Sequence, residues 1–325
     1  MRLSRRTTLL SGLAALGVAP AAAQGQPSEL RLGVGAAAEE TLWMLEARPD
    51  LAPNQGRIYR LNITRFPGTD RRFQAYEAGA LDLLTGSSHA VSMAAAEGSD
   101  FRVVASLSRE SAQGFSQQYF VLENSPIRRV QDLRGRTLGT NGIGSSTHLW
   151  AKIVLERAGL DPERDVTFLP VRFPAMGEAL RAGRIDVGTF PQPFAQAEED
   201  RGGLRSLFTS KDAAPFDEEL MLLLASPRLL SERPAVARAF LSDLVRVTRF
   251  YIEQPEEARR ALVNARIVRM PVADFIRMRD YYREPNARPD PAALERSQEL
   301  LLRGGFQRNR VDFSRIVDTS FLPAS

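Results

Sequence analysis

The sequence predicts an α/β protein of two similar lobes, and two observations carry this prediction. Short runs of alternating apolar residues are each followed by a loop and then by apolar residues at helical spacing, which is the pattern of consecutive βα units. The same order of segments recurs further along the chain. With 325 residues, 43% of them hydrophobic, the chain is long enough for two domains with substantial cores.

The first series of segments begins at Leu30. Leu30, Leu32 and Val34 alternate with polar or small residues, as in a strand, and a Gly/Ala loop follows them. The next predicted elements are a helix over 39–47, a strand and turn over 61–67, a helix through 73–80 and a strand over 81–85. This series therefore contains two βα units.

A second series repeats this order. It comprises a strand over 137–140, a loop over 141–147, a helix to residue 158 and a strand over 166–171. The tripeptide Arg-Phe-Pro occurs in both series, at 65–67 and 172–174. Three landmarks recur at nearly constant separation: Gly33 and Gly139 at 106 residues, Arg65 and Arg172 at 107, and Asp82 and Asp186 at 104. Such a repeat indicates two lobes of one βα design.

An Ala-Gly pair followed by an Asp marks the last strand of each series. Gly79 and Gly183 are expected to end their helices in the left-handed conformation, and Asp82 and Asp186 to start the next strands. We interpret these residues as structural rather than as ligand contacts.

The chain after residue 216 does not form a third copy. An apolar strand over 220–225 is expected to cross back to the first lobe. Helices follow, because Val236, Phe240, Leu244 and Tyr251 recur at helical spacing behind Pro234. We expect these helices to pack on the first lobe.

Residues 1–24 have the layout of a secretory signal peptide. Arg2, Arg5 and Arg6 form a basic start, residues 9–19 are apolar, and small residues precede an expected cleavage near Gln24. Residues 4–9 resemble a twin-arginine export signal, with Thr8 where that signal usually has Phe. Removal of the three arginines takes the formal charge from +4 to +1. The sequence thus predicts an exported, soluble, periplasmic protein.

The composition excludes several classes of function. The absence of Cys rules out disulfides, thiolate metal sites, Cys nucleophiles and a lipid-modified Cys. Nearly all basic residues are Arg, with Lys only at Lys152 and Lys211, which indicates base composition rather than a nucleic-acid patch. His89 and His148 have no carboxylate at metal-ligand spacing. We expect no metal, no cofactor, no nucleic-acid partner and a monomer.

Several segments together point to a family. They are residues 30–35, 78–86, 103–108, 125–127, 132–135, 144–148 and 191–194. Over residues 29–265 their order resembles the SsuA/THI5-like (NMT1-like) substrate-binding proteins of ABC importers for sulfonates, nitrate, taurine and thiamine precursors.

This resemblance implies a type II periplasmic-binding-protein fold. A discontinuous first lobe would comprise 25–118 and 221–325, and the second lobe 119–220, with crossing strands near 118–123 and 220–225 as the hinge. Such proteins close over a small ligand and present the closed form to an ABC transporter permease. A sensor module on the same fold is an alternative. Enzymes on the fold, a thiamine-pyrimidine synthase and menaquinone-precursor dehydratases, are disfavoured by the export signal and, for the synthase, by the absence of Cys.

Ligands of open α/β sheets bind beyond the carboxyl ends of the strands, and one such loop is rich in donors. Gly144, Ser145, Ser146 and Thr147 open a helix, where backbone N–H groups, hydroxyls and the positive helix end favour an anion. The alternative is that Ser145 or Ser146 only caps the helix. The loop is not a nucleotide P-loop, since no Lys follows at the required spacing.

Other candidate contacts follow other strands. Ser87 and Ser88 would offer hydroxyl groups from the first lobe, and Gln192 stands where relatives often have an acid. The remaining candidates are Phe173 and Phe190, which could stack on a planar ligand, and Arg109, which could pair with an anion. The loop over 35–39 lacks the Tyr-Gln pair common in relatives, so we predict a small, anionic organic ligand of the sulfonate or carboxylate type that differs from the usual substrates.

Overall fold

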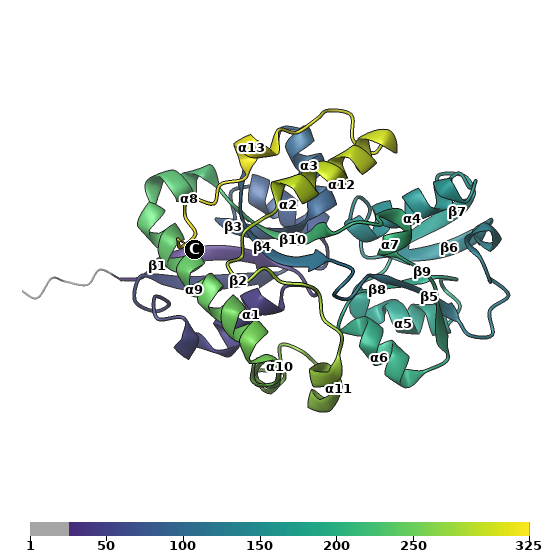
Figure 1. Ribbon diagram of the computed structural model, residues 1–325, viewed down its shortest axis with the longest axis horizontal. Helices are drawn as coiled ribbons and strands as arrows, with labels where there is room; N and C mark the ends of the chain where they lie inside the picture. The colour runs from purple at the N-terminus through teal and green to yellow at the C-terminus, as the bar shows by residue number, and fades with distance from the viewer. Residues whose placement is uncertain (1–25, 325) are drawn as a thin grey trace, which may run out of the picture.

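The computed structural model describes residues 26–324, which form two α/β lobes joined side by side (Figure 1). The predicted signal peptide over 1–24 lies outside the described residues. The first lobe contains a five-stranded sheet in the order β2-β1-β3-β10-β4. Its strands are β1 (Ser28–Val34), β2 (Tyr59–Arg65), β3 (Leu83–Ser87), β4 (Arg102–Glu110) and β10 (Glu218–Ala225).

The second lobe repeats this strand order. Its strands are β5 (Gln118–Leu122), β6 (Arg136–Thr140), β7 (Val166–Pro170), β8 (Gly188–Phe190) and β9 (Leu204–Thr209). β8, β5 and β9 form one sheet and β6 pairs with β7, while a parallel bridge between Leu138 and Val187 joins β6 to β8. The resulting order, β7-β6-β8-β5-β9, matches the first lobe strand for strand.

Equivalent hydrogen bonds at the two Asp landmarks confirm the repeat. The Asp82 carboxylate accepts the Arg31 N–H at 3.0 Å, and the Asp186 carboxylate accepts the Thr137 N–H at 2.8 Å. Each Asp therefore fastens the start of a lobe's third strand to its first strand. Gly79 and Gly183 have φ values of 73° and 67°, as expected for glycines that end helices.

Two strands cross between the lobes, as predicted. The chain leaves the first lobe after β4 and enters the second as β5, and it returns after β9 as β10. Both β5 and β10 run antiparallel to their neighbours. The expected crossing at 220–225 begins two residues earlier, at Glu218. The division of the lobes at 118/119 and 220/221 stays a prediction.

The third strand of the first lobe differs from the prediction by two residues. The apolar run at 81–85 predicted a strand there, whereas β3 spans Leu83–Ser87. Leu81 instead packs over Gly33 on β1, where an added Cβ would meet its side chain at 2.6 Å. As a result Ser87 ends the strand and Ser88 begins the next helix.

Helices cover both sheets. In the first lobe they are α1 (Glu40–Ala47), α2 (Thr69–Glu77) and α3 (Ser88–Ala96), and in the second α4 (Ser146–Arg157), α5 (Phe173–Arg181), α6 (Phe194–Arg201) and α7 (Ser210–Ala213). The C-terminal helices are α8 (Pro227–Glu232), α9 (Pro234–Glu253), α10 (Pro255–Asn264), α11 (Val272–Arg277), α12 (Pro291–Arg303) and α13 (Phe313–Ile316). α9 packs on α1, and α12 packs on α3 and β10, so the C-terminal helices cover the first lobe as predicted.

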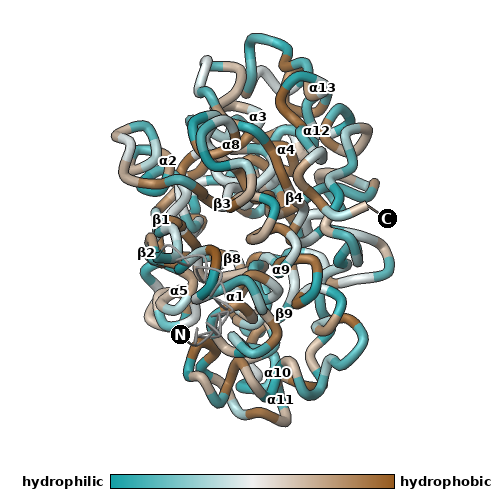
Figure 2. The backbone as a smooth tube through the Cα atoms, turned by 90° about the vertical axis from the view of Figure 1, so that its left-hand side faces the viewer, coloured by the Kyte–Doolittle hydropathy of each residue, from teal (hydrophilic) through white to brown (hydrophobic). Residues whose placement is uncertain are grey.

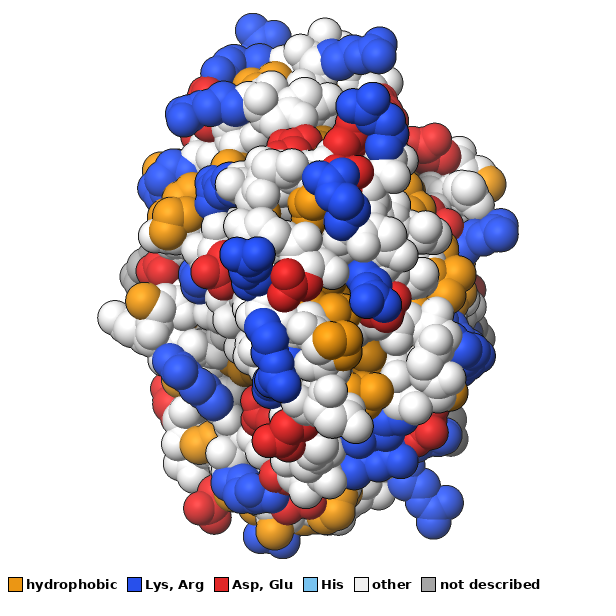
Figure 3. Space-filling view, turned by 90° about the vertical axis from the view of Figure 1, so that its right-hand side faces the viewer, with side chains coloured by type: hydrophobic (Ala, Val, Ile, Leu, Met, Phe, Trp, Pro, Cys, Tyr) orange, Lys and Arg blue, Asp and Glu red, His pale blue; other side chains and the backbone are white. Residues whose placement is uncertain are grey.

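The surface and core have an ordinary globular pattern. Hydrophobic and hydrophilic positions alternate within single helices, as Figure 2 shows. At the end of the second lobe, Lys and Arg side chains lie among Asp and Glu side chains (Figure 3). Between residues 26 and 324, no helix has the length and apolar character needed to cross a membrane.

Candidate functional site

A cavity lies between the two lobes and is partly open to solvent. Pockets at the boundary between two units of a protein are common sites for small molecules. The wall consists of first-lobe loops (35–39, 66–69, Arg72, Ser87), second-lobe loops (Asn141, 145–147, Phe173, Pro191), crossing segments (Gln117, Leu220, Met221) and Tyr281. The loops follow the carboxyl ends of β1, β2, β3, β6, β7 and β8, the edge where α/β sheets bind ligands.

The Arg-Phe-Pro repeat contributes to the cavity in both lobes. Phe66 and Pro67 follow β2 in the first lobe, and Phe173 follows β7 in the second. All three line the wall. Together with the alanines at 36–38, Leu220 and Met221, they provide the apolar part of the cavity.

The donor-rich loop of the second lobe is held in place by its own hydrogen bonds. Ser145 is the N-cap of α4, and its hydroxyl accepts from the His148 N–H at 3.5 Å and donates to the Gly142 carbonyl at 2.7 Å. The Thr147 hydroxyl is bonded to those of Thr140 and Ser145, each at 3.0 Å. Both alternatives therefore find support, because Ser145 caps the helix while Ser145, Ser146 and Thr147 all line the cavity.

His148 fixes the turn of this loop. The Gly144 N–H donates to Nδ1 of His148 at 3.1 Å, and Gly144 has a φ of 77°. Burial lowers the pKa of His148 to about 4, so its ring is neutral at neutral pH and Nδ1 can accept. The Gly144 N–H is thereby used within the loop, and Gly144 is not among the lining residues.

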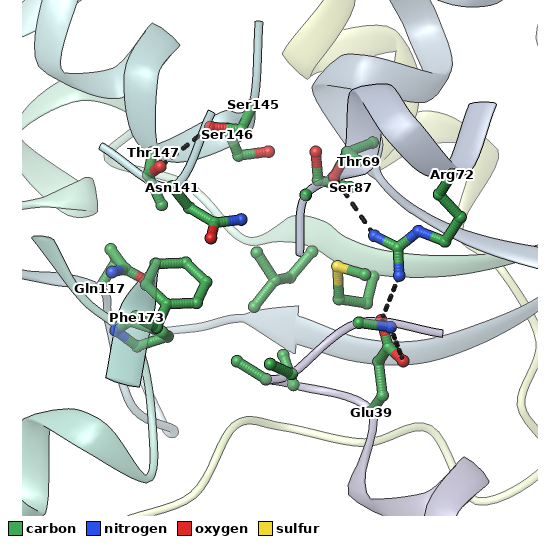
Figure 4. Close-up of a pocket in the computed structure, with 18 of the residues that line it drawn as sticks. Glu39, Thr69, Arg72, Ser87, Gln117, Asn141, Ser145, Ser146, Thr147 and Phe173 are labelled. Carbon is green, nitrogen blue, oxygen red and sulfur yellow. Dashed lines mark hydrogen bonds and ion pairs between the residues drawn. The ribbon is translucent and has the colours of Figure 1, made fainter. Parts of the chain in front are cut away.

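Four buried polar atoms of wall residues have no hydrogen-bond partner among residues 26–324. They are Oγ of Ser87 at the end of β3, Oγ of Ser146 in the first turn of α4, Nε2 of Gln117 beside β5, and Nε of Arg72 in α2. Figure 4 shows Ser87 on one side of the cavity and Ser146 and Gln117 on the other. Because buried polar groups are nearly always hydrogen-bonded, these groups are available to a ligand or to water.

A buried ion pair, which sequence analysis did not identify, also reaches the cavity. Arg72 of α2 donates to Glu39 at 3.0 Å and to the Thr85 hydroxyl. Glu39 also accepts from the Gly35 N–H at 3.0 and 2.9 Å and from the Thr85 hydroxyl at 2.6 Å. Burial lowers the pKa of Arg72, against the opposing effect of Glu39. Figure 4 shows the guanidinium lying between Thr69 and Glu39.

Five of the predicted site residues lie outside the cavity wall, and Gly144, described above, is one of them. Phe190 is fully buried and stacks on Phe120 at 5.1 Å between ring centroids. The Gln192 side chain donates to the Arg279 carbonyl at 3.0 Å. Ser88 begins α3 with a buried hydroxyl that does not face the cavity.

The fifth is Arg109 on β4, whose side chain bonds β10 and the C-terminal segment. Its guanidinium donates to Glu219 at 2.8 Å and to the Arg288 carbonyl at 2.6 Å. It lines a separate hollow with Tyr282 and Arg296. Our set of proposed ligand contacts therefore leaves out these five residues.

The chain is similar to proteins whose names describe the binding of small anions. A protein of Escherichia coli strain K12, named for the binding of aliphatic sulfonates, is 28% identical over 210 residues, which cover 62% of this chain and 61% of that protein. The match thus spans less than two thirds of that relative's length.

Solved structures confirm the fold. The alkanesulfonate-binding protein of Xanthomonas axonopodis pv. citri, solved with bound MOPS, has a TM-score of 0.73 at 20% identity, covering 90% of this chain and 99% of that one. The periplasmic nitrate-binding protein of Synechocystis PCC 6803 has a TM-score of 0.72 at 13% identity, covering 91% and 87%. The expected type II periplasmic-binding-protein fold is therefore confirmed.

The family assignment is confirmed as well. The NMT1/THI5 like family model matches residues 61–258, which is more than half of the chain. This stretch includes both crossing strands, the second lobe and most of the polar cavity wall. The protein belongs to the NMT1/THI5 like family.

Proposed function

We propose that this protein is a periplasmic solute-binding protein that captures a small organic anion by lobe closure and delivers it to an ABC importer. The relatives named for binding aliphatic sulfonates, alkanesulfonate and nitrate support a binding role. The convergence of Ser87, Ser146 and Gln117 on one cavity is the observation that carries the proposal.

These three groups suit an anion because they can all donate hydrogen bonds. Two hydroxyls and an amide N–H can satisfy the oxygens of a sulfonate or carboxylate without bringing a charge of their own. The apolar wall from Phe66, Phe173 and Leu220 suits the organic part of such a ligand. Nε2 of Gln117 can only donate, so it would offer a cation no partner.

The two lobes also contact each other outside the cavity wall, which supports closure as the mechanism. The Trp150 indole of α4 donates to Glu218 on β10 at 3.0 Å. The rings of His89 on α3 and Trp150 meet edge to face at 5.5 Å. A ligand that touches both lobes stabilises such an arrangement relative to an open one.

A thermal-shift screen of alkanesulfonates, carboxylates, nitrate, pyrimidines, amines and apolar compounds tests the anion proposal. Ligands that bind the folded state raise the unfolding temperature by mass action, so at least one small organic anion should do so. Ser87→Ala should remove a donor and lower affinity for that anion roughly tenfold. Ser231→Ala, on an exposed helix, is the matched control. Stabilisation by amines or apolar compounds alone would refute an anionic ligand.

Export is tested on the full chain. We expect a tagged protein expressed with residues 1–24 to appear in the periplasmic fraction at a reduced mass. If the twin-arginine route is used, a variant with both Arg5→Lys and Arg6→Lys should stay unprocessed. Full processing of that variant would indicate the general secretory route instead. An unprocessed wild-type chain would contradict export.

A further inference from the structure

The cavity wall carries one positive and one negative side chain among the residues that the structure describes. They are Arg72 and Glu39, and their charged groups lie 3.0 Å apart. The side chain of Arg72 is 3% exposed and that of Glu39 is fully buried. All other side chains in the wall are neutral, so the cavity as a whole has no net charge.

Neither partner of this pair can turn toward a ligand at low cost. The Arg72 guanidinium donates to Glu39 and Thr85 from one nitrogen and to Thr69 from the other, the last at 3.3 Å. Both oxygens of Glu39 accept from the Gly35 N–H. Separating the pair would leave buried charges unpaired, which is strongly unfavourable. The pair is a fixed part of the wall.

Three neutral donors, on Ser87, Ser146 and Gln117, are left for a ligand, together with Nε of Arg72, whose positive charge Glu39 already balances. Hydrogen bonds from neutral donors can compensate the loss of water around one negative charge. A second negative charge would enter a cavity whose cation among the described residues, Arg72, is already paired. Glu39 would repel that charge, and only the paired Arg72 would reduce the repulsion.

We propose that the Glu39–Arg72 pair is a specificity determinant that makes the cavity select organic anions with one negative charge and reject those with two. This inference rests on the proposed function and adds the charge of the ligand to it. Glu39 acts by cancelling the charge of Arg72. Removal of the negative charge of Glu39 should therefore convert a neutral wall into a positive one.

The experiment compares propane-1-sulfonate, with one charge, and 3-sulfopropanoate, with two, by isothermal titration calorimetry. The wild type should bind propane-1-sulfonate at least tenfold tighter. Glu39→Gln should reduce this preference tenfold or more, through tighter binding of 3-sulfopropanoate. Glu39→Gln with Arg72→Gln restores a neutral wall and should restore the preference. Arg72→Lys keeps the charge of the pair and should leave the preference unchanged.

Loss of folding in Glu39→Gln would be detected by circular dichroism, and Thr69→Lys then serves in its place. It adds a cation to the wall while Glu39 stays, and Thr69→Met of similar length is its control. The preference should fall in Thr69→Lys and hold in Thr69→Met.

The outcomes separate this inference from the proposed function. If the wild type binds propane-1-sulfonate but folded Glu39→Gln or Thr69→Lys keeps the full preference, charge selection by the pair is wrong and anion binding stands. If the double variant behaves like Glu39→Gln alone, net charge is not the cause and the inference is also wrong. If the wild type binds no anion in the thermal-shift screen, the proposed function fails and the inference fails with it.

Discussion

Ser145 and Ser146 are adjacent, but their hydrogen bonds assign them different roles. Ser145 caps α4, whereas the Ser146 hydroxyl has no partner in the part of the chain that the structure describes. Ser145→Ala should therefore lower the free energy of unfolding by about 1 kcal/mol. Ser146→Ala should leave that free energy nearly unchanged and weaken anion binding instead. Urea unfolding and calorimetry on the two single variants measure both effects, and equal behaviour of the two would contradict this division.

Individual residues also show what the sequence could and could not predict. The loop with Ser145, Ser146 and Thr147 was identifiable because glycines and hydroxyl residues follow a strand and open a helix. The Glu39–Arg72 pair was not, because its members are 33 positions apart and their pairing depends on how α2 packs on β1. Arg109 was a reasonable anion partner until β10 placed Glu219 opposite it.

At the scale of elements, the crossing strands bring a buried carboxyl group to the junction of the lobes. Glu110 ends β4 opposite Glu218 on β10, and it accepts from the Gln117 N–H at 3.1 Å and the Ser210 hydroxyl at 2.6 Å. Burial raises the pKa of Glu110 to about 7, and Glu218 adds to this, while the Ser210 bond and Lys211 oppose it. The folded protein thus holds this proton to a higher pH than the unfolded chain does.

This difference in pKa predicts a pH-dependent stability. The contribution of protonated Glu110 is fully present below the ordinary pKa of 4.5 and is lost as the pH rises to about 7, a change of at most ~3 kcal/mol. Glu110→Gln keeps the group neutral, so the free energy of unfolding of this variant relative to the wild type should grow from pH 5 to pH 7.5. Urea unfolding across this range measures that difference, with exposed Glu123→Gln as control. A constant difference would show that Glu110 is ionised throughout.

The order of elements was predictable to a greater extent than their boundaries. The repeated landmarks predicted two copies of one βα design, since helix-ending glycines and strand-starting aspartates are local signals. The two-residue displacement of β3 was not predictable, because Leu81 is as apolar as a strand residue and only its packing over Gly33 excludes it from β3. That displacement puts the Ser87 hydroxyl in the cavity wall and Ser88 outside it.

At the scale of the whole molecule, the lobes are joined by more than the two crossing strands. The segment between α11 and α12 contacts the second lobe at Gln192. The Gln192 N–H donates to the Tyr281 hydroxyl at 3.2 Å, and its side chain donates to the Arg279 carbonyl at 3.0 Å. Arg277 on α11 pairs with Asp200 on α6 at 2.7 Å. The C-terminal segment thus forms a non-covalent connection between the lobes.

If closure drives binding, this connection must contribute to affinity although Gln192 lies outside the cavity wall. Gln192→Ala removes the bond to Arg279 and so destabilises the closed arrangement relative to an open one. The fraction of closed molecules then falls, and the apparent affinity falls by the same factor. We expect a loss of several-fold in anion affinity and a larger radius of gyration without ligand, measured by calorimetry and small-angle X-ray scattering. Ser231→Ala, at an exposed position on α8, is the control. Unchanged affinity and radius in Gln192→Ala would mean that the C-terminal segment moves with the second lobe, and that opening occurs at the crossing strands alone.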